Sequence, residues 1–238
     1  MVTVTEILSS IMDGNPGPTT LPELLCAKCS SHLEVTGVGM ALMSDAGHQG
    51  VVGATDGTAR VMEDLQFTLG EGPCIDSSTE GRPVLQPDLA MTAMTRWPAF
   101  GPAVMDAGVA AIFAFPLQVG GIKLGVLDLY RDTTGNLGAA AFTDALVYAD
   151  AAVVLLLHLQ EQMKPGDGLH PQLANSVGNR SEVHQATGMI SVQAAVGLAE
   201  ALLLMRAHAF AVDRSILKIA MDVINRRLRF DLDRDDNV

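Results

Sequence analysis

The chain has 238 residues, of which 48% are apolar and only 4% aromatic, so it can build a packed core and is not a largely disordered protein. Its formal net charge of −12 argues against nucleic-acid binding when the charge is taken over the whole chain. The charge is uneven, because residues 171–230 hold seven Lys or Arg and four Asp or Glu. An acidic segment joined to a basic one is typical of a regulator with a separate nucleic-acid-binding module.

The chain contains three cysteines, which are too few for a disulfide framework and fit a reducing compartment. Its N-terminus lacks the basic segment and apolar stretch of a signal peptide. The longest strongly apolar run, residues 151–157, is much shorter than the ~20 residues of a membrane helix. We therefore expect a soluble, cytoplasmic protein with no membrane contact.

The N-terminal part of the chain predicts helices followed by strands. Apolar residues at helical spacing predict a helix over residues 4–12, which the Asn15-Pro16-Gly17-Pro18 segment ends. Thr20 is expected to cap a second helix, with Glu23 in its first turn and its end near His32. The later elements are expected as strands at 35–43 and 49–54, a helix at 58–67, a loop at 69–74, a strand at 83–85, a mixed segment at 91–106, and strands at 110–119 and 123–130 around Gly120-Gly121.

Three motifs mark this region: Gly70-Glu71-Gly72-Pro73-Cys74, Gly81-Arg82-Pro83-Val84, and Phe115-Pro116-Leu117 with Gly120 and Leu124-Gly125-Val126-Leu127. With the order of the elements, they resemble a GAF domain, a sensor module related to PAS, over about residues 20–160. The resemblance implies an α+β fold, an antiparallel sheet with flanking helices, and a pocket for a small-molecule or redox signal. Cys74, Trp97 and Phe115 are the candidate ligand-binding residues, although Cys74 also fits the role of a small buried residue.

Residues 139–163 predict a long helix with apolar residues at steps of three, four and seven. The Pro165-Gly166-Asp167-Gly168 segment ends it and marks a domain boundary. A helix that runs from a sensor toward an output module is often a dimer helix, so we expect a homodimer. The alternative is a helix that packs only on its own sheet.

The C-terminal segment carries three motifs in order: Gln185-Ala186-Thr187-Gly188, Met205-Arg206-Ala207, and Arg214 with Leu217 and Ala220. They resemble the ANTAR domain, a three-helix RNA-binding module of bacterial antiterminators. Thr187 departs from the family, which usually has Lys there, so one expected positive charge is missing. The resemblance implies an all-α module that binds RNA hairpins with small loops. Its helices are expected at 173–192, 193–208 and 213–230, the last capped by Asp213.

If the third helix runs to Phe230, its polar side is opposite its apolar side and lies within about a 60° arc. The residues in this arc are Arg214, Lys218, Asn225 and Arg229. Lys and Arg there neutralise phosphates and Asn reads base edges, although a solvated helix face explains the same spacing. The Gln185–Gly188 element equally fits tight helix packing, and Arg206 equally fits a role in bracing helices. The candidate RNA-binding residues are Arg180, Gln185, Thr187, Gly188, Arg206, Arg214, Lys218, Asn225 and Arg229.

Catalytic and metal-binding motifs are not apparent in the sequence. Cys26 and Cys29, followed by His32, suggest metal binding or dithiol chemistry, but no second Cys/His pair completes four ligands. Two core-facing helix cysteines are the simpler interpretation. The sequence shows no phosphate loop, nucleophile elbow or paired-carboxylate arrangement. We therefore expect no enzyme activity, no metal and no cofactor.

These interpretations divide the chain into an N-terminal helix and linker (1–19), a GAF-like sensor domain (20–164), an ANTAR-like RNA-binding domain (169–231) and an acidic tail (232–238). The expected function is a transcription antitermination regulator that binds hairpins in nascent RNA under control of its sensor domain. Two alternatives remain open. One is a protein-interaction regulator without RNA binding, and the other is a methionine sulfoxide reductase of the GAF type.

Overall fold

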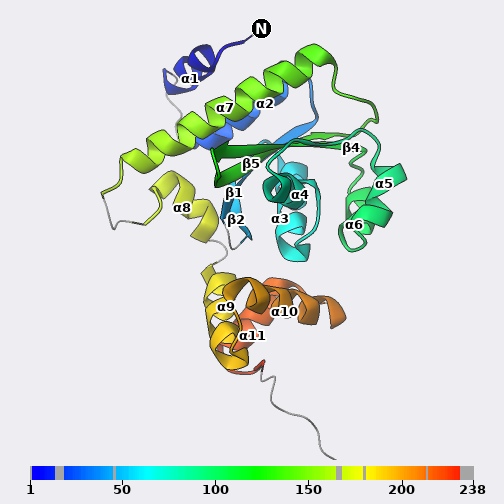
Figure 1. Cartoon of the computed structure of the whole chain (residues 1–238), viewed down its shortest axis with the longest axis vertical. Helices are drawn as coiled ribbons and strands as arrows, with labels where there is room; N and C mark the ends of the chain where they lie inside the picture. Colours follow the sequence, from blue (N-terminus) through cyan, green and yellow to red (C-terminus); the bar gives the residue numbers. More distant parts are fainter. Residues whose placement is uncertain are drawn as a thin grey trace, which may run out of the picture. The chain divides into compact units, whose positions relative to one another are not determined.

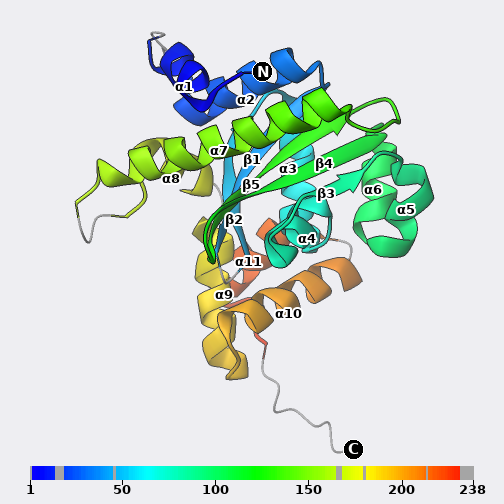
Figure 2. The ribbon, with the colours of Figure 1, turned by 45° about the horizontal axis from the view of Figure 1, so that its top comes forward.

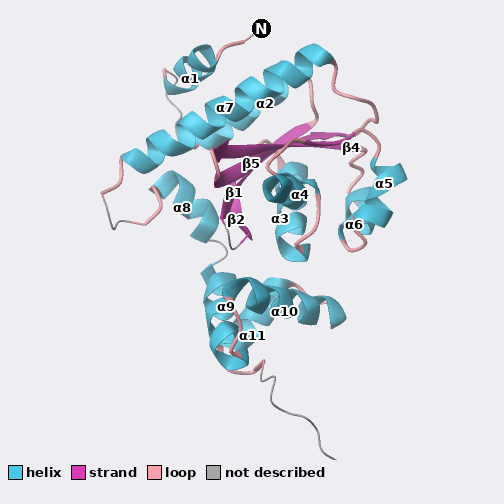
Figure 3. Ribbon diagram, viewed as in Figure 1, coloured by secondary structure: helices cyan, strands magenta, loops and turns pink. Residues whose placement is uncertain are grey.

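The computed structural model describes residues 2–13, 19–44, 47–164, 168–178, 181–212 and 214–230. Contacts divide the chain into two compact units, Met1–Val177 and Gly178–Val238, and each unit is described by itself. The first unit combines a sheet with helices and the second is helical (Figures 1 and 3). The expected α+β fold followed by an all-α module is therefore confirmed.

A five-stranded antiparallel sheet forms the centre of the first unit, in the order β2-β1-β5-β4-β3 (Figure 2). Two hairpins build most of it, as the alternating patterns and the Gly120-Gly121 turn predict. The central strand β5 pairs with β1 on one side and with β4 on the other. The strands are β1 (Gly37–Ser44), β2 (Gly47–Ala54), β3 (Val84–Gln86), β4 (Ala111–Val119) and β5 (Ile122–Arg131).

Helices cover both faces of this sheet and create two separate cores (Figure 1). One face packs against α1 (Val4–Met12), α2 (Leu21–Leu33) and α7 (Ala139–Glu161), and α8 (Pro171–Gly178) adds Leu173 to the same core. The other face lies against the remaining helices. These are α3 (Gly57–Leu69), α4 (Pro73–Glu80), α5 (Leu89–Arg96) and α6 (Phe100–Asp106).

The strand residues alternate between these two cores, as the period of two requires. In β4, Phe113 and Phe115 belong to the core with α7, whereas Ile112 and Ala114 belong to the core with α3 and α4. Phe115 packs against Phe142 of α7, with ring centroids 5.8 Å apart. We refer to the two sides below as the α7 face and the α3 face.

The capping signal at the start of α2 is confirmed. The Thr20 hydroxyl accepts a hydrogen bond from the Glu23 backbone N–H (3.3 Å), and the Glu23 carboxylate accepts one from the Thr20 N–H (2.9 Å). This reciprocal pair satisfies two backbone donors that a helix N-terminus otherwise leaves without partners. The helix ends at Leu33, one residue beyond the expected end.

The helices α4, α5 and α6 differ from the expectation of a loop and a mixed segment. The helix α4 begins at Pro73, inside the predicted loop, because proline is well suited to the first turn. Gly72 precedes it with φ +129°, a conformation that favours glycine. Glycine and proline therefore mark the start of a helix here, and not a continuing loop.

The second unit packs three helices, α9 (Ser181–Ala194), α10 (Leu198–Ala211) and α11 (Ile216–Ile224), around an aliphatic core. The helix expected over 173–192 corresponds to α8, which is described to Gly178, and to α9, which is described from Ser181, and residues 179–180 lie outside the described residues. The second helix starts later than expected, after Ala195 in a left-handed conformation and Gly197 as N-cap. The core residues are Val183, Ala186, Ile190, Ala194, Ala201, Leu202, Met205, Ala209, Ile216, Ile219, Ala220 and Val223.

The third helix is also shorter than the predicted 213–230, which changes the geometry of its basic residues. Ser215 caps α11, with its hydroxyl accepting from the Lys218 N–H at 3.4 Å, and the predicted cap Asp213 lies outside the described residues. The helix ends at Ile224 because Arg226 adopts φ +58° and the next two N–H groups donate to the Asp222 carbonyl. The single helical arc of Arg214, Lys218, Asn225 and Arg229 is therefore wrong, since only Lys218 lies within α11.

Among the described residues, α7 is the single continuous helix long and apolar enough to cross a membrane. Its apolar character has another explanation, because eight of its side chains are buried in the α7-face core, among them Tyr148, Leu155 and Leu159. A core helix of a soluble protein passes the same test of length and composition. These buried side chains place α7 in the core of the first unit.

We predict that Leu155→Ala lowers the unfolding free energy of the first unit by about 2–5 kcal/mol, because it leaves a cavity under α7. Leu155 is 1% exposed, whereas Val61 of α3 is 50% exposed. The matched variant Val61→Ala is expected to change stability by no more than about 0.5 kcal/mol. Chemical denaturation followed by fluorescence of Trp97, the single tryptophan, reports this unit. Equal losses for both variants would contradict the core role of α7.

Candidate functional site

A cluster of polar side chains lies buried on the α3 face of the sheet. It combines a histidine, two carboxylic acids, an amide, a thiol and a phenol, all at most 2% exposed. Buried polar groups are costly unless they are paired, so a cluster of this kind indicates a site for a ligand or an ion. Its members are His48 of β2, Glu63 and Gln66 of α3, Cys74 of α4, and Asp128 and Tyr130 of β5.

Glu63 reaches the sheet through a gap that Gly39 of β1 leaves open. A Cβ atom at Gly39 would lie 2.1 Å from Oε1 of Glu63, so only glycine fits there without displacing the carboxylate. The Tyr130 hydroxyl donates a hydrogen bond to the same Oε1 at 2.7 Å. The bond from β5 holds the carboxylate of α3 against the sheet.

Gln66 connects α3 with both α4 and β5. Its amide oxygen accepts a hydrogen bond from the Cys74 N–H at 2.8 Å, near the start of α4. Its amide nitrogen donates to Oδ2 of Asp128 at 3.3 Å and lies 3.4 Å from the Tyr130 hydroxyl. One side chain therefore fixes the first turn of α4 and one oxygen of the Asp128 carboxyl group.

His48 faces Glu63 from β2. Its Nε2 lies 3.6 Å from Oε2 of Glu63, which is beyond a good hydrogen bond. The ring meets Phe67 edge-on, with centroids 5.4 Å apart. The imidazole therefore lies beside the Glu63 carboxylate and against the Phe67 ring.

The cluster perturbs the acidity of its members. Burial raises the pKa of Asp128 well above its usual range, and the neighbouring Glu63 carboxylate and hydrogen bonding with it raise it further. Burial, then the charge of Glu63, raises the pKa of Tyr130. The buried polar residues that the structure describes include two carboxylic acids and no Lys or Arg. The site therefore favours a cation, or a proton, over an anion.

The three residues predicted to bind a ligand do not come together. Cys74 belongs to the cluster, but Phe115 lies on the α7 face, so one pocket on the α3 face cannot include both. Trp97 lies on the α3 face and is 2% exposed. Its Nε1 donates to Asp76 at 3.2 Å.

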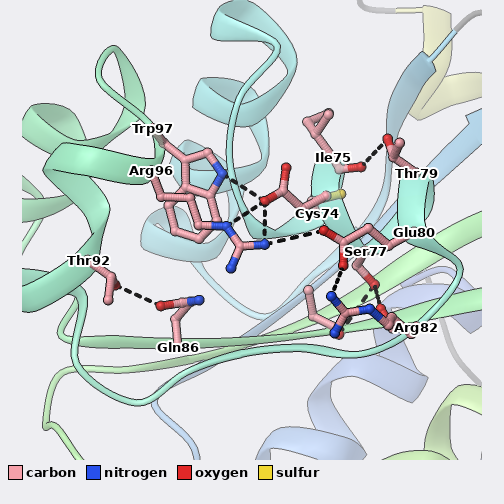
Figure 4. A network of polar contacts seen from close by, with 12 residues as sticks. Cys74, Ile75, Ser77, Thr79, Glu80, Arg82, Gln86, Thr92, Arg96 and Trp97 are labelled. Carbon is pink, nitrogen blue, oxygen red and sulfur yellow. Dashed lines mark hydrogen bonds and ion pairs between the residues drawn. The ribbon is translucent and has the colours of Figure 1, made fainter.

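A second polar network surrounds Trp97 at the surface of α4 and α5 (Figure 4). The Arg96 guanidinium donates to Asp76 at 2.8 Å, lies 3.5 Å from Glu80 and stacks 5.0 Å from the centre of the Trp97 ring. Glu80 also pairs with Arg82. These contacts join α5 to α4 and support the wall of the cluster without entering it.

Cys26 and Cys29 lie on the α7 face, in the core with α2 and α7. Both side chains are fully buried, and burial raises the pKa of each thiol well above its usual range. Their placement matches the interpretation of two core-facing helix cysteines. Because the sheet separates them from Cys74, neither can form a disulfide with it.

The residues predicted to bind RNA occupy several different positions in the second unit. Gln185 is exposed, Gly188 and Arg206 are half-buried, and Arg180 lies outside the described residues. Thr187 is 7% exposed, and its hydroxyl donates to the Val183 carbonyl at 2.7 Å. The structure therefore places Thr187 inside the helical core, where it has no free surface to offer RNA.

Exposed cations gather before, on and after α11. Arg214 pairs with Asp222 at 2.7 Å, and Lys218, Asn225 and Arg229 are exposed. The turn that ends α11 also exposes Arg226 and Arg227, which the helical-wheel argument missed. We refer to Arg214, Lys218, Arg226, Arg227 and Arg229 as the α11 cations.

The segment after α11 returns to the other two helices. The Phe230 N–H donates to Oε1 of Gln193 at 3.0 Å, and the Phe230 ring meets His208 edge-on at 5.5 Å. These contacts anchor the chain just beyond Arg229. A side chain at 229 is therefore presented from a fixed backbone although it lies outside a helix.

No protein-family model and no curated protein sequence matches this chain. The first unit is similar in structure to the GAF domain of an Acinetobacter phosphoenolpyruvate-protein phosphotransferase, with 9% identity and a TM-score of 0.50 over 68% of this chain and 94% of that one. This similarity, with the sheet order and flanking helices, shows a GAF fold over about two thirds of the chain.

Two further solved structures illustrate what the fold carries elsewhere. The GAF domain of the cyanobacteriochrome TePixJ has 16% identity and a TM-score of 0.47 over 66% of this chain and 94% of its own. A free methionine-R-sulfoxide reductase from Thermoplasma acidophilum has 15% identity and a TM-score of 0.42 over 56% of this chain and 89% of its own. Sensor and regulatory domains predominate among the similar structures, and the reductase is an enzyme.

The sequence reasoning missed five of the six cluster residues: His48, Glu63, Gln66, Asp128 and Tyr130. A usable signal was present in β5, where Asp128 interrupts an apolar strand at a position that alternation assigns to a core. In α3, Glu63 and Gln66 are three residues apart and share a helix face with Ala59 and Met62. Polar residues at buried positions of two elements point to one shared site.

We predict that Gly39→Ala destabilises the first unit by about 1–3 kcal/mol, because the added methyl group overlaps the Glu63 carboxylate. In a Glu63→Ala background the same change should cost no more than about 0.5 kcal/mol, since the overlapping group is gone. Gly121→Ala, in open space at the β4–β5 turn, serves as control. Equal losses from Gly39→Ala in both backgrounds, measured by Trp97 fluorescence in denaturant, would refute this packing.

Proposed function

We propose that this chain is a cytoplasmic, signal-responsive regulator of transcription antitermination. The GAF-fold unit senses a small-molecule, ionic or redox signal at the buried polar cluster, and the C-terminal unit binds hairpins in nascent RNA. The observation that carries the RNA half is the group of exposed α11 cations in a chain whose net charge is −12. The ANTAR-like motifs of the sequence support the same assignment.

The sensing half is supported by the composition of the cluster. A fold that needs only a hydrophobic core has no reason to bury two carboxylic acids, an imidazole and a thiol together. The groups come from β2, α3, α4 and β5, so a ligand there contacts every layer on the α3 face. A ligand with different affinities for two arrangements of these layers shifts their populations.

The output half is supported by chemistry that suits phosphates. Guanidinium and ammonium groups neutralise phosphates and release counterions, which supplies affinity. Asn225 and Gln185 are exposed amides that can read base edges. Phe210 of α10 is 72% exposed and offers a ring on which an unpaired loop base can stack.

An exposed apolar stripe on α7 supports the homodimer. Leu146, Val154 and Leu157 of this helix are 39%, 44% and 40% exposed. Their spacing of eight and three residues keeps them on one helix side. Two copies of this stripe could bury each other in a symmetric contact.

We predict that the double variant Lys218→Ala/Arg229→Ala weakens binding to all RNA hairpins alike and lowers the slope of log affinity against log salt by about one unit per lost contact. The reason is that phosphate contacts carry charge and not sequence. Binding is measured on a set of hairpins at several salt concentrations.

Two controls accompany this RNA experiment. Lys28→Ala removes an equally exposed cation from the first unit and should leave affinity unchanged. Arg214→Ala tests a cation already paired with Asp222 and should have a smaller effect than the double variant. The RNA assignment fails if the double variant stays folded and binds hairpins with the parental affinity and salt slope.

We predict that the chain is a dimer at micromolar concentration and that Val154→Glu/Leu157→Glu makes it monomeric, because charges replace the apolar stripe. Multi-angle light scattering gives the mass. Met91→Glu alters a side chain of α5 that is 78% exposed and should leave the dimer intact. A parent chain that is monomeric at this concentration would rule out the dimer.

A further inference from the structure

We infer that the cluster on the α3 face is a binding site for one divalent transition-metal ion of the zinc or ferrous class. Its ligands are Nε2 of His48, a carboxylate oxygen of Glu63 and the sulfur of Cys74. Their ligand atoms all lie within 4.8 Å of one another, and all three side chains are buried. Asp128 stands beside them, where its carboxyl group interacts with that of Glu63 and with the Cys74 thiol.

The spacing of the imidazole and the carboxylate suits a shared ion better than a direct bond. Nε2 of His48 and Oε2 of Glu63 are 3.6 Å apart, which is long for a hydrogen bond. Two ligands about 2.1 Å from one tetrahedral ion lie roughly 3.4 Å from each other. A small inward movement of Cys74 then completes three ligands around one centre.

Both carboxyl groups are oriented as ligands in metal sites usually are. Tyr130 holds Oε1 of Glu63 at 2.7 Å, and Gln66 holds Oδ2 of Asp128 at 3.3 Å. The other two oxygens, Oε2 of Glu63 and Oδ1 of Asp128, are buried and accept no hydrogen bond from the described residues. Neighbouring donors that fix one oxygen and leave the second available are characteristic of the groups around metal ligands.

The charge of the cluster also calls for a cation. Glu63, Asp128 and Cys74 are three acidic groups in one buried cluster, and the buried residues that the structure describes include no Lys or Arg. A divalent ion compensates most of that charge, and the Cys74 thiol loses its proton to solvent as the ion binds. Thiolate and imidazole ligands select zinc or iron over calcium and magnesium, which prefer oxygen ligands.

A cavity of about 110 Å³ shares Tyr130 with the cluster and is also lined by Asp56, Arg131 and Asp132. Two of these three charged side chains are acidic, which favours cations over anions at the cavity. Three protein ligands leave a fourth position open, as in sites whose metal binds a further molecule.

This inference deepens the sensing half of the proposed function and does not depend on the RNA half. A chain that binds hairpins but no metal keeps the RNA assignment and loses this one. A chain that binds metal but no RNA does the reverse. The two failures are therefore distinguishable in the same preparation.

The test uses the full chain, stripped with a chelator and titrated with Co²⁺ and Zn²⁺. We expect one ion per chain by elemental analysis, visible Co²⁺ bands of low symmetry, and a near-ultraviolet band from thiolate to cobalt. Cys74→Ser should abolish the thiolate band, and His48→Gln should weaken the visible ones. Tyr130→Phe keeps all three ligands and should lower affinity about 10–100-fold, because Glu63 is no longer oriented.

Cys29→Ala is the matched control, since Cys29 is equally buried but lies on the α7 face. It should leave both bands unchanged. The inference is overturned if the parent chain binds neither ion, if the thiolate band survives Cys74→Ser, or if Cys29→Ala removes it. Circular dichroism shows whether each variant folds. If Cys74→Ser does not fold, the inference is tested by the weaker visible bands expected of His48→Gln and by the lower affinity expected of Tyr130→Phe.

Discussion

The hydrogen bond from Tyr130 to Glu63 is the interaction on which the first unit depends. It joins β5, the central strand, to α3, and both side chains are almost completely buried. A carboxyl group in that position is expensive unless it is paired, so α3 can pack only where this bond forms. The missing side chain of Gly39 makes room for it, and Gln66 ties the same helix to α4 and to Asp128. The order of the α3 face follows from satisfying these groups together.

Much of this unit could be predicted from the sequence because its elements follow local rules. The hairpins follow from alternation and from Gly120-Gly121, and α2 follows from Thr20 and Glu23. The cluster could not be predicted in that way. Periodicity assigns a charged residue to solvent, and the groups that make burial of Glu63 acceptable lie on other elements, His48 on β2 and Tyr130 on β5, the latter 67 residues away in the chain. Only the sheet topology brings them together, and it separates Phe115 from Cys74 for the same reason.

In the second unit, the ends of the helices are what could not be predicted from the sequence. Its helical character could be predicted from the motifs, but the limits of its helices depend on single backbone conformations. Arg226 ends α11 in a left-handed conformation that usually favours glycine, so no sequence signal marks the end. The ring of Phe230 against His208 then holds the following segment. The α11 cations are exposed because of this turn and not because they share one helical arc, so the arc predicted too few of them. Thr187, a candidate RNA-binding residue, lies in the helical core, as the alternative of tight helix packing allowed.

The sheet separates a polar α3 face from an apolar α7 face, and this division shapes how the proposed sensor would work. A ligand at the cluster contacts Asp128 of β5, whose two neighbours Leu127 and Leu129 point into the core that also contains Tyr148 and Leu155 of α7. Because that core is close-packed, a displacement of β5 cannot be absorbed by empty space and must shift α7 or be resisted by it. A ligand that binds one position of β5 more tightly therefore favours one position of α7 as well. The exposed side chains Leu146, Val154 and Leu157 belong to the same helix, so occupancy of the buried site would also move the surface proposed here as a dimer contact.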